Sequence, residues 1–171
     1  MGPARSYRAR QVRSLPGSRS ATIDIVTQSP MWAARRDSRA VLKRAIRQAA
    51  SAVALKGGEV AVVLADDTIL RGLNRIWRQQ DKPTNVLSFR ADPRPIARAI
   101  PPLLGDIVIA YETTEREARA QGKPFAHHLA HLAVHGFLHL LGYDHQAEHE
   151  AQAMEELEVS ILARLGIPNP Y

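Results

Sequence analysis

The stretch that says most about this chain runs from residue 135 to residue 145 and reads His135-Gly136-Phe137-Leu138-His139-Leu140-Leu141-Gly142-Tyr143-Asp144-His145. On a helix, residues four apart lie on the same face, so the imidazoles of His135 and His139 should leave the helix side by side. Gly142 can adopt the left-handed conformation that ends a helix and turns the chain. That turn can bring His145 back toward the other two.

Three neutral imidazoles are a ligand set of catalytic zinc, because they leave the fourth position of the metal to water. We therefore expect one Zn²⁺ per chain, held by His135, His139 and His145. The alternative is that the three histidines are ordinary polar residues of a helix and a loop.

The spacing of these histidines equals that of the metzincin metalloproteases, H-E-x-x-H-x-x-G-x-x-H. The residue after the first histidine differs, because the glutamate that serves those enzymes as a general base is replaced by Gly136. Glycine cannot take a proton, so a peptidase that works through this glutamate is disfavoured. Hydrolysis by a metal-activated water remains open.

Cations surround a second stretch, where a predicted helix ends in a tight turn. They are Arg75, Arg78 and Lys82, followed by Thr84 and Ser88, whose hydroxyls can bond phosphate oxygens. Arginine suits a phosphate because its planar fork donates two parallel hydrogen bonds. The alternative is a solvated basic helix end, which the helix dipole favours.

Together the two stretches resemble the YbeY family, the bacterial metal-dependent endoribonucleases of ribosomal RNA maturation. The resemblance rests on L-N-x-x-x-R-x-x-D-K-P-T-[DN]-V-L-S-F at 73–89, L-L-G-D-I-V-I-A at 103–110 and H-L-x-V-H-G-x-L-H-L-L-G-Y-D-H at 131–145. There are two departures: Arg90, where relatives usually carry proline, and a long Arg-rich N-terminus. Neither touches the histidine motif.

The resemblance implies zinc at His135, His139 and His145, and it makes Arg78 the functionally important arginine. It implies a single-strand-specific endoribonuclease of the cytoplasm, acting in maturation of the 3′ end of 16S ribosomal RNA and in ribosome quality control. The implied partners are ribosomal RNA and the small ribosomal subunit, with a small-subunit ribosomal protein and an Era-type GTPase as further candidates. A metalloprotease-like hydrolase and a non-catalytic, zinc-containing ribosome-assembly factor stay open as alternatives.

Other residues near the histidine motif have more than one interpretation. Asp144 either acts at the site, by orienting an imidazole or accepting a proton, or is a turn residue. His131 is expected in the core rather than in the cleft. His127, His128 and His149 are expected at the surface.

The composition sets the broad class. A length of 171 residues suits one domain, and a hydrophobic fraction of 45% is ordinary for a globular protein. No run approaches the roughly 20 apolar residues that span a bilayer, so no membrane association is expected. The chain has no cysteine, which excludes disulfides, thiol catalysis and Cys-ligated zinc.

The net charge of +6 is concentrated at the N-terminus. Residues 1–20 contain five of the 23 cations and no acid, which leaves 18 cations against 17 acids in the rest of the chain. We expect 1–20 to be a disordered basic arm and 21–171 to be a single catalytic domain. The arm either binds RNA backbone through its charge or is an inert tail.

Hydrophobic periodicity predicts strands at 22–26, 60–65, 86–89 and 106–110. Helices should follow the caps at 37–38 and at 66, and should occupy 114–120, 125–141 and 148–165. The segment 91–102 is Pro-rich and is expected to be a loop.

Two of the predicted helices matter for the site. The helix after residue 66 carries an apolar stripe that ends at Trp77, so Trp77 should face the core and Arg78 a rim. The helix at 125–141 is apolar on most faces and should therefore be central. We expect an α+β, zincin-like domain in which a mixed four-stranded sheet packs with about five helices around this metal-bearing helix.

Overall fold

The computed structural model describes residues 20–92, 102–143 and 147–171. In chain order its elements are β1 (Thr22–Thr27), the 3-10 helix η1 (Pro30–Ala34), α1 (Ser38–Ala52), β2 (Glu59–Ala65), α2 (Asp67–Arg78), β3 (Val86–Arg90), β4 (Leu103–Ala110), α3 (Tyr111–Ala120), α4 (Phe125–Leu140) and α5 (Glu148–Arg164). Four strands and five α-helices in this part of the chain confirm the predicted α+β class. Residues 1–19 of the predicted basic arm and most of the Pro-rich loop lie outside the described residues.

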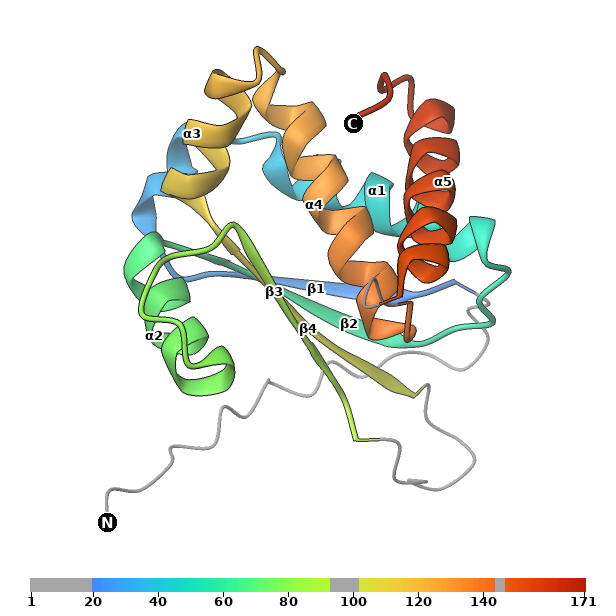
Figure 1. Cartoon of the computed structure of the whole chain (residues 1–171), viewed down its shortest axis with the longest axis horizontal. Coiled ribbons are helices and arrows are strands. Elements are labelled where there is room, and N and C mark those ends of the chain that lie inside the picture. Colours follow the sequence, from blue (N-terminus) through green and yellow to red (C-terminus); the bar gives the residue numbers. More distant parts are fainter. Residues whose placement is uncertain (1–19, 93–101, 144–146) are drawn as a thin grey trace.

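The four strands form one mixed sheet in the order β1-β2-β4-β3 (Figure 1). β1 is parallel to β2 and β2 is parallel to β4, since helix-containing crossovers join them. β3 is antiparallel to β4 and lies at one edge of the sheet. The connection from β2 to β4 thus runs through α2 and places the edge strand beside the end of that helix.

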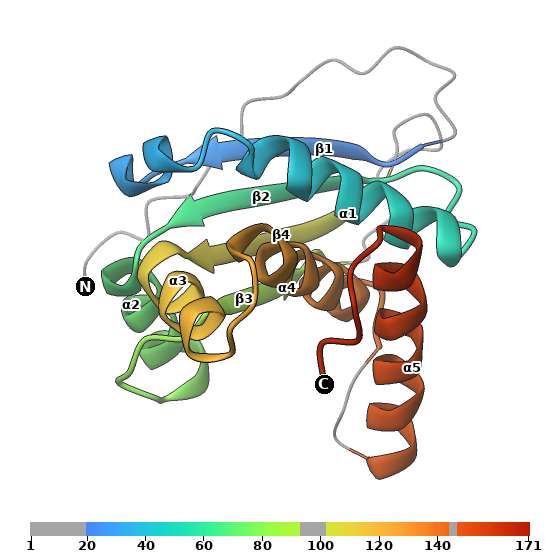
Figure 2. The same ribbon diagram turned by 90° about the horizontal axis from the view of Figure 1, so that it is seen from above.

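Alternation along the strands gives the sheet two different faces. On the larger face, Val62 of β2 and Ile107 of β4 belong to the main core, which α1 and α4 cover (Figure 2). α4 contacts α1, α3, α5, β3 and β4, and its Phe137 and Leu138 are fully buried. The prediction of a central helix at this place is therefore confirmed.

α2 packs on the other face, over a small cluster that includes Leu70, Leu87 and Val108. Trp77 in the last turn of α2 is 67% exposed, so the prediction that it faces the core is wrong. The helical period does place Trp77 one turn after Leu73, but the cluster beneath α2 ends before the last turn of the helix.

The sequence predicts side-chain caps at the N-termini of α1 and α2, and the structure has one of the two. Asp66 accepts a hydrogen bond from the backbone N–H of Ile69 at 3.0 Å and so caps α2 as predicted. Asp37 precedes α1 but makes no such side-chain bond.

Among the described residues, no helix is both long and apolar enough to cross a membrane.

Candidate active-site groove

The central helix α4 presents three histidines in a row, His131, His135 and His139, each one turn after the last. The ring centroids of His135 and His139 lie 4.5 Å apart, and their Nε2 atoms lie 3.1 Å apart. Two nitrogens bound to one tetrahedral zinc at about 2.0–2.1 Å would be about 3.3 Å from each other. The two imidazoles are therefore spaced as two ligands of one metal ion.

The turn after α4 has the geometry that Gly142 predicts. Gly142 has a φ of +96°, and its N–H and that of Tyr143 donate to carbonyls in the last turn of α4 at 3.0 and 3.1 Å. These two bonds form a Schellman motif, which ends a helix and redirects the chain. Residues 144–146 lie outside the described part, so the third ligand, His145, stays a prediction. The described residues alone contain no group of three or more His, Cys, Asp or Glu side chains that could hold a metal.

Glu158 of α5 is a buried carboxylate that forms hydrogen bonds with two of these histidines, His131 and His135. Its Oε1 accepts a hydrogen bond from Nδ1 of His135 at 2.6 Å. Its Oε2 accepts from Nε2 of His131 at 3.3 Å and from the hydroxyl of Tyr171. Because an ionised carboxylate only accepts, Nδ1 of His135 carries the proton and Nε2 keeps the lone pair that a metal needs.

The contacts of Glu158 set its ionisation. Burial by itself would raise the pKa of Glu158, but hydrogen bonds from His131 and His135 outweigh it and lower the pKa to about 2. The carboxylate is therefore charged at neutral pH. Burial and the bond to Glu158 raise the pKa of Tyr171, so the phenol keeps its proton and donates it to the carboxylate.

Replacing Glu158 with glutamine should weaken zinc binding by about 10- to 100-fold, because the amide keeps the shape of the carboxylate but loses its charge and one acceptor. Competition with a chelator measures the affinity. The matched control is Glu156→Gln, which removes an exposed carboxylate from the same helix and should leave zinc affinity unchanged. Equal affinities of the Glu158→Gln variant and the unmodified protein would contradict the orienting role.

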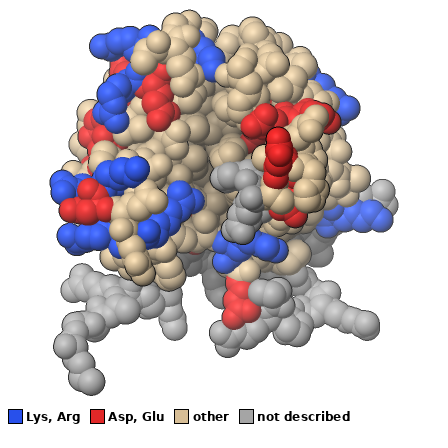
Figure 3. Space-filling view, in the orientation of Figure 1, with Lys and Arg blue, Asp and Glu red and all other residues tan. Residues whose placement is uncertain are grey.

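The histidines of α4 open into a groove of about 850 Å³ bordered by β3, α4 and the end of the chain. Three cations and a threonine contribute to its lining: Arg78, Arg90, Lys123 and Thr84. Figure 3 shows Lys and Arg gathered over α2 on one side of the molecule, and Asp and Glu over α5 on the other. The groove thus has a basic border that suits a polyanion.

Of the cations predicted around the turn after α2, Arg78 lines the groove, whereas Arg75 and Lys82 do not. Arg78 is exposed, and within the described residues it has no hydrogen-bond or ion-pair partner, so its guanidinium is available to a phosphate. Ser88 also lines the groove, but its hydroxyl donates to the carbonyl of Gly136 at 3.1 Å. That proton is therefore not available for the predicted bond to a phosphate.

Gly136 lies on the side of α4 that rests on the sheet. A Cβ at this position would come within 2.9 Å of Cγ2 of Ile107 and 3.0 Å of Oγ of Ser88. The position that carries the catalytic glutamate in the metzincin motif therefore has no room for a side chain here. This packing adds a structural argument against a glutamate-dependent peptidase.

Replacing Gly136 with alanine should lower the free energy of unfolding by about 1–3 kcal/mol, because overpacking against buried Ile107 outweighs the gain in helix propensity. Gly72→Ala is the control, since it makes the same change in α2, where nothing lies within 4 Å of the added Cβ. That control should raise stability by up to about 1 kcal/mol. Urea unfolding compares the two, and equal stabilities would contradict the close packing of α4 on the sheet.

The other histidines follow the predictions only in part. His128, expected at the surface, is buried with its Nε2 2.8 Å from Oε2 of Glu117, because α3 packs against this side of α4. His131, expected in the core, is half-buried and lines the groove. His149 is exposed as predicted, and His127 is half-buried.

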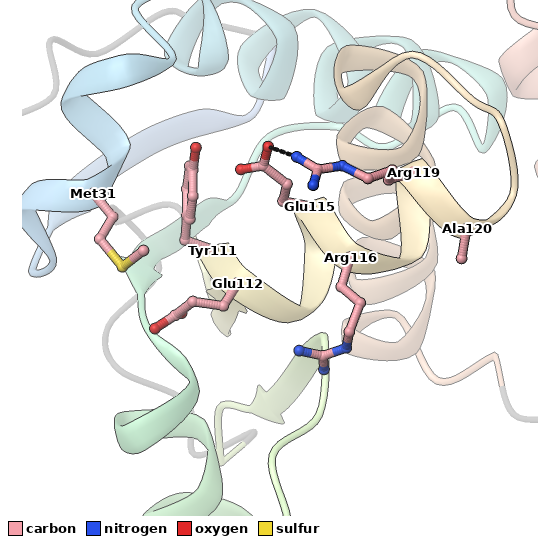
Figure 4. Close-up of a pocket in the computed structure, with 7 residues that line it drawn as sticks. All are labelled: Met31, Tyr111, Glu112, Glu115, Arg116, Arg119 and Ala120. Carbon is pink, nitrogen blue, oxygen red and sulfur yellow. Dashed lines mark hydrogen bonds and ion pairs between the residues drawn. The ribbon is translucent and has the colours of Figure 1, made fainter.

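A second hollow of about 580 Å³ borders α3 and is separate from the histidines (Figure 4). Its charged groups are engaged with protein neighbours: Glu115 with Arg119 at 3.1 Å, and Arg116 with Asp67 at 3.6 Å. Such paired charges form salt bridges of the fold. The histidine groove is therefore the candidate active site.

Sequence reasoning missed Glu158 and Tyr171. A signal for Glu158 was present, because this carboxylate lies on the same stripe of α5 as buried Met154 and Ile161. A charged residue on an apolar stripe needs a buried partner, and histidines are natural ones. Nothing in the local pattern around Tyr171 marks its contact with Glu158.

The fold and the groove together define an α+β protein in which a histidine pair, backed by a buried carboxylate, lies beside cations suited to phosphate. The family model described as endoribonuclease YbeY matches residues 25–166. A protein of Rhodopseudomonas palustris named endoribonuclease YbeY is 54% identical over 151 residues, which cover 86% of this chain and 80% of the relative. One of Nitrobacter winogradskyi with the same name is 49% identical over 174 residues, covering 99% and 92%.

The chain belongs to the endoribonuclease YbeY family, as the motifs at 73–89, 103–110 and 131–145 predict. The solution structure of TM1509 from Thermotoga maritima has the same fold, with a TM-score of 0.51 and 21% identity. The likeness covers 85% of this chain and 92% of that one.

Proposed function

We propose that this chain is a zinc-dependent endoribonuclease that cuts single-stranded RNA in the groove beside α4. The observation that carries the proposal is the convergence of the Nε2 atoms of His135 and His139, 3.1 Å apart, in a groove that Arg78 also lines. His145 would complete the ligand set. Family membership supports RNA as the substrate.

The residues of the groove divide the work. His135, His139 and His145 would hold the zinc ion, which when bound would supply Lewis-acid activation of water and of the scissile phosphate. The planar guanidinium of Arg78 donates two hydrogen bonds to the phosphate. Its positive charge neutralises the negative charge that grows on the phosphate as the bond breaks. Arg90 and Lys123 attract the flanking phosphates, and Glu158 orients His135.

We further propose that the activity serves maturation of the 3′ end of 16S ribosomal RNA and ribosome quality control. The partners are then ribosomal RNA and the small ribosomal subunit, assisted by a small-subunit ribosomal protein and an Era-type GTPase. A ribosomal substrate places the action in the cytoplasm. The support is the family resemblance, together with a groove whose basic border fits a polyanion.

The test is to incubate the zinc-loaded protein with single-stranded RNA, with the matching duplex and with casein, before and after chelation. We expect cleavage of the single strand alone, lost on chelation and restored by zinc. Cleavage of casein would favour the metalloprotease alternative. Stoichiometric zinc without cleavage of either polymer would favour the assembly factor, and RNA cleavage that survives complete metal removal would contradict the metal-dependent mechanism.

A further inference from the structure

Trp77 in the last turn of α2 forms an aromatic pair with Phe89 of β3, and neither residue lines the groove. Trp77 is 67% exposed, and its ring centroid lies 5.7 Å from that of Phe89 on β3, with the planes tilted by 59°. Phe89 itself packs against the small cluster beneath α2. One side of the indole thus packs against the ring of Phe89, while most of the indole remains exposed to solvent.

Charges of opposite sign flank this aromatic pair. Arg78 follows Trp77 directly and lines the groove. Asp106 is the cross-strand partner of Phe89, so it lies on the same face of the sheet, and it is exposed. A phosphate is drawn to the arginine side and repelled from the carboxylate, which can instead accept hydrogen bonds from the amino group of a base.

We propose that Trp77, supported by Phe89, is a stacking platform for an unpaired base of the RNA strand whose phosphate Arg78 binds. The inference rests on the proposed function and adds a nucleotide subsite outside the groove, next to Arg78, which lines the groove. Every base has a π face, so an exposed indole accepts bases with little regard to sequence. A base in a duplex is already stacked on its neighbours, so the platform selects single strands.

The two tryptophans of the chain allow this contact to be observed directly. Trp32 is only 3% exposed, and its Nε1 donates to the carbonyl of Ala65 at 2.8 Å, so a dissolved oligonucleotide cannot reach its ring. Trp77 is the accessible tryptophan. Fluorescence of a Trp32→Phe variant therefore reports on Trp77 alone, and that of a Trp77→Phe variant on Trp32.

The experiment mixes zinc-loaded protein with a single-stranded RNA oligomer in a stopped-flow instrument, so that binding is read before cleavage. RNA should quench the fluorescence of the Trp32→Phe variant and leave that of the Trp77→Phe variant unchanged. Trp77→Ala should weaken RNA binding by about tenfold. Ile76→Ala is the matched control, because Ile76 is equally exposed at 67% on the same turn but cannot stack; its binding should equal that of the unmodified protein.

An abasic oligomer of the same length and charge separates stacking from phosphate binding. The unmodified protein should prefer the base-containing strand, and Trp77→Ala should abolish this preference while keeping its affinity for the abasic strand. If the unmodified protein cleaves RNA but Trp77 is not quenched and Trp77→Ala binds as before, the stacking site is refuted and the proposed function stands. If the unmodified protein neither binds nor cleaves RNA, both proposals fail.

Discussion

Replacing His139 with alanine should abolish zinc retention and, with it, RNA cleavage. His139 and His135 supply two of the three proposed ligands, and a site reduced to two imidazoles has fewer protein ligands than a catalytic zinc requires. His139 is half-buried at the groove, so its truncation leaves the core of α4 in place. Elemental analysis of the purified variant measures zinc per chain.

The control for this prediction is His149→Ala, which removes an exposed histidine from the first turn of α5 and should leave zinc stoichiometric. Circular dichroism of both variants checks that the helices remain. Stoichiometric zinc in the double variant His135→Ala/His139→Ala would refute the metal site altogether.

Replacing Arg78 with alanine should reduce RNA cleavage at least tenfold while the zinc content stays unchanged, because the proposed partner of Arg78 is the phosphate. Arg78→Lys should recover little activity, since a point charge cannot reproduce the two parallel hydrogen bonds of the guanidinium. Initial rates at saturating RNA and zinc content are the two measurements.

Arg75→Ala is the matched control for Arg78. Both residues are exposed cations in the last turn of α2, but Arg78 lines the groove and Arg75 does not. The two variants change the net charge equally, so any difference between them reflects position. If Arg75→Ala loses RNA cleavage and Arg78→Ala keeps it, the wrong arginine has been assigned to the phosphate.

The elements of the fold could be predicted because their signals are local. The β-branched run at 60–65 marks an inner strand, and the apolar faces of 125–141 mark a central helix. The end of that helix is encoded by one residue, Gly142, whose positive φ only a few residue types tolerate. The same local spacing sets His135 and His139 side by side, so half of the site could be read from a single helix.

The rest of the site depends on contacts between distant segments, which no local pattern contains. Glu158 reaches His135 across 23 residues of chain, and the period of α5 shows only that its carboxylate turns inward. His128 is buried because α3 happens to supply Glu117 beside it. The stripe that ends in Trp77 is a correct helical pattern, but the size of the cluster under α2 decides where burial stops.

On the face that Figure 3 shows, cations lie over α2 and carboxylates over α5, so this face has a positive side and a negative side and acts as an electric dipole. An approaching polyanion begins to interact with that dipole within a Debye length, about 8 Å at physiological ionic strength. The resulting torque turns α2 toward the strand and α5 away before any contact forms, so encounters occur in one preferred orientation. Added salt should therefore slow the capture of RNA, whereas bond breaking in the proposed groove, where groups act at contact distance, should be screened far less.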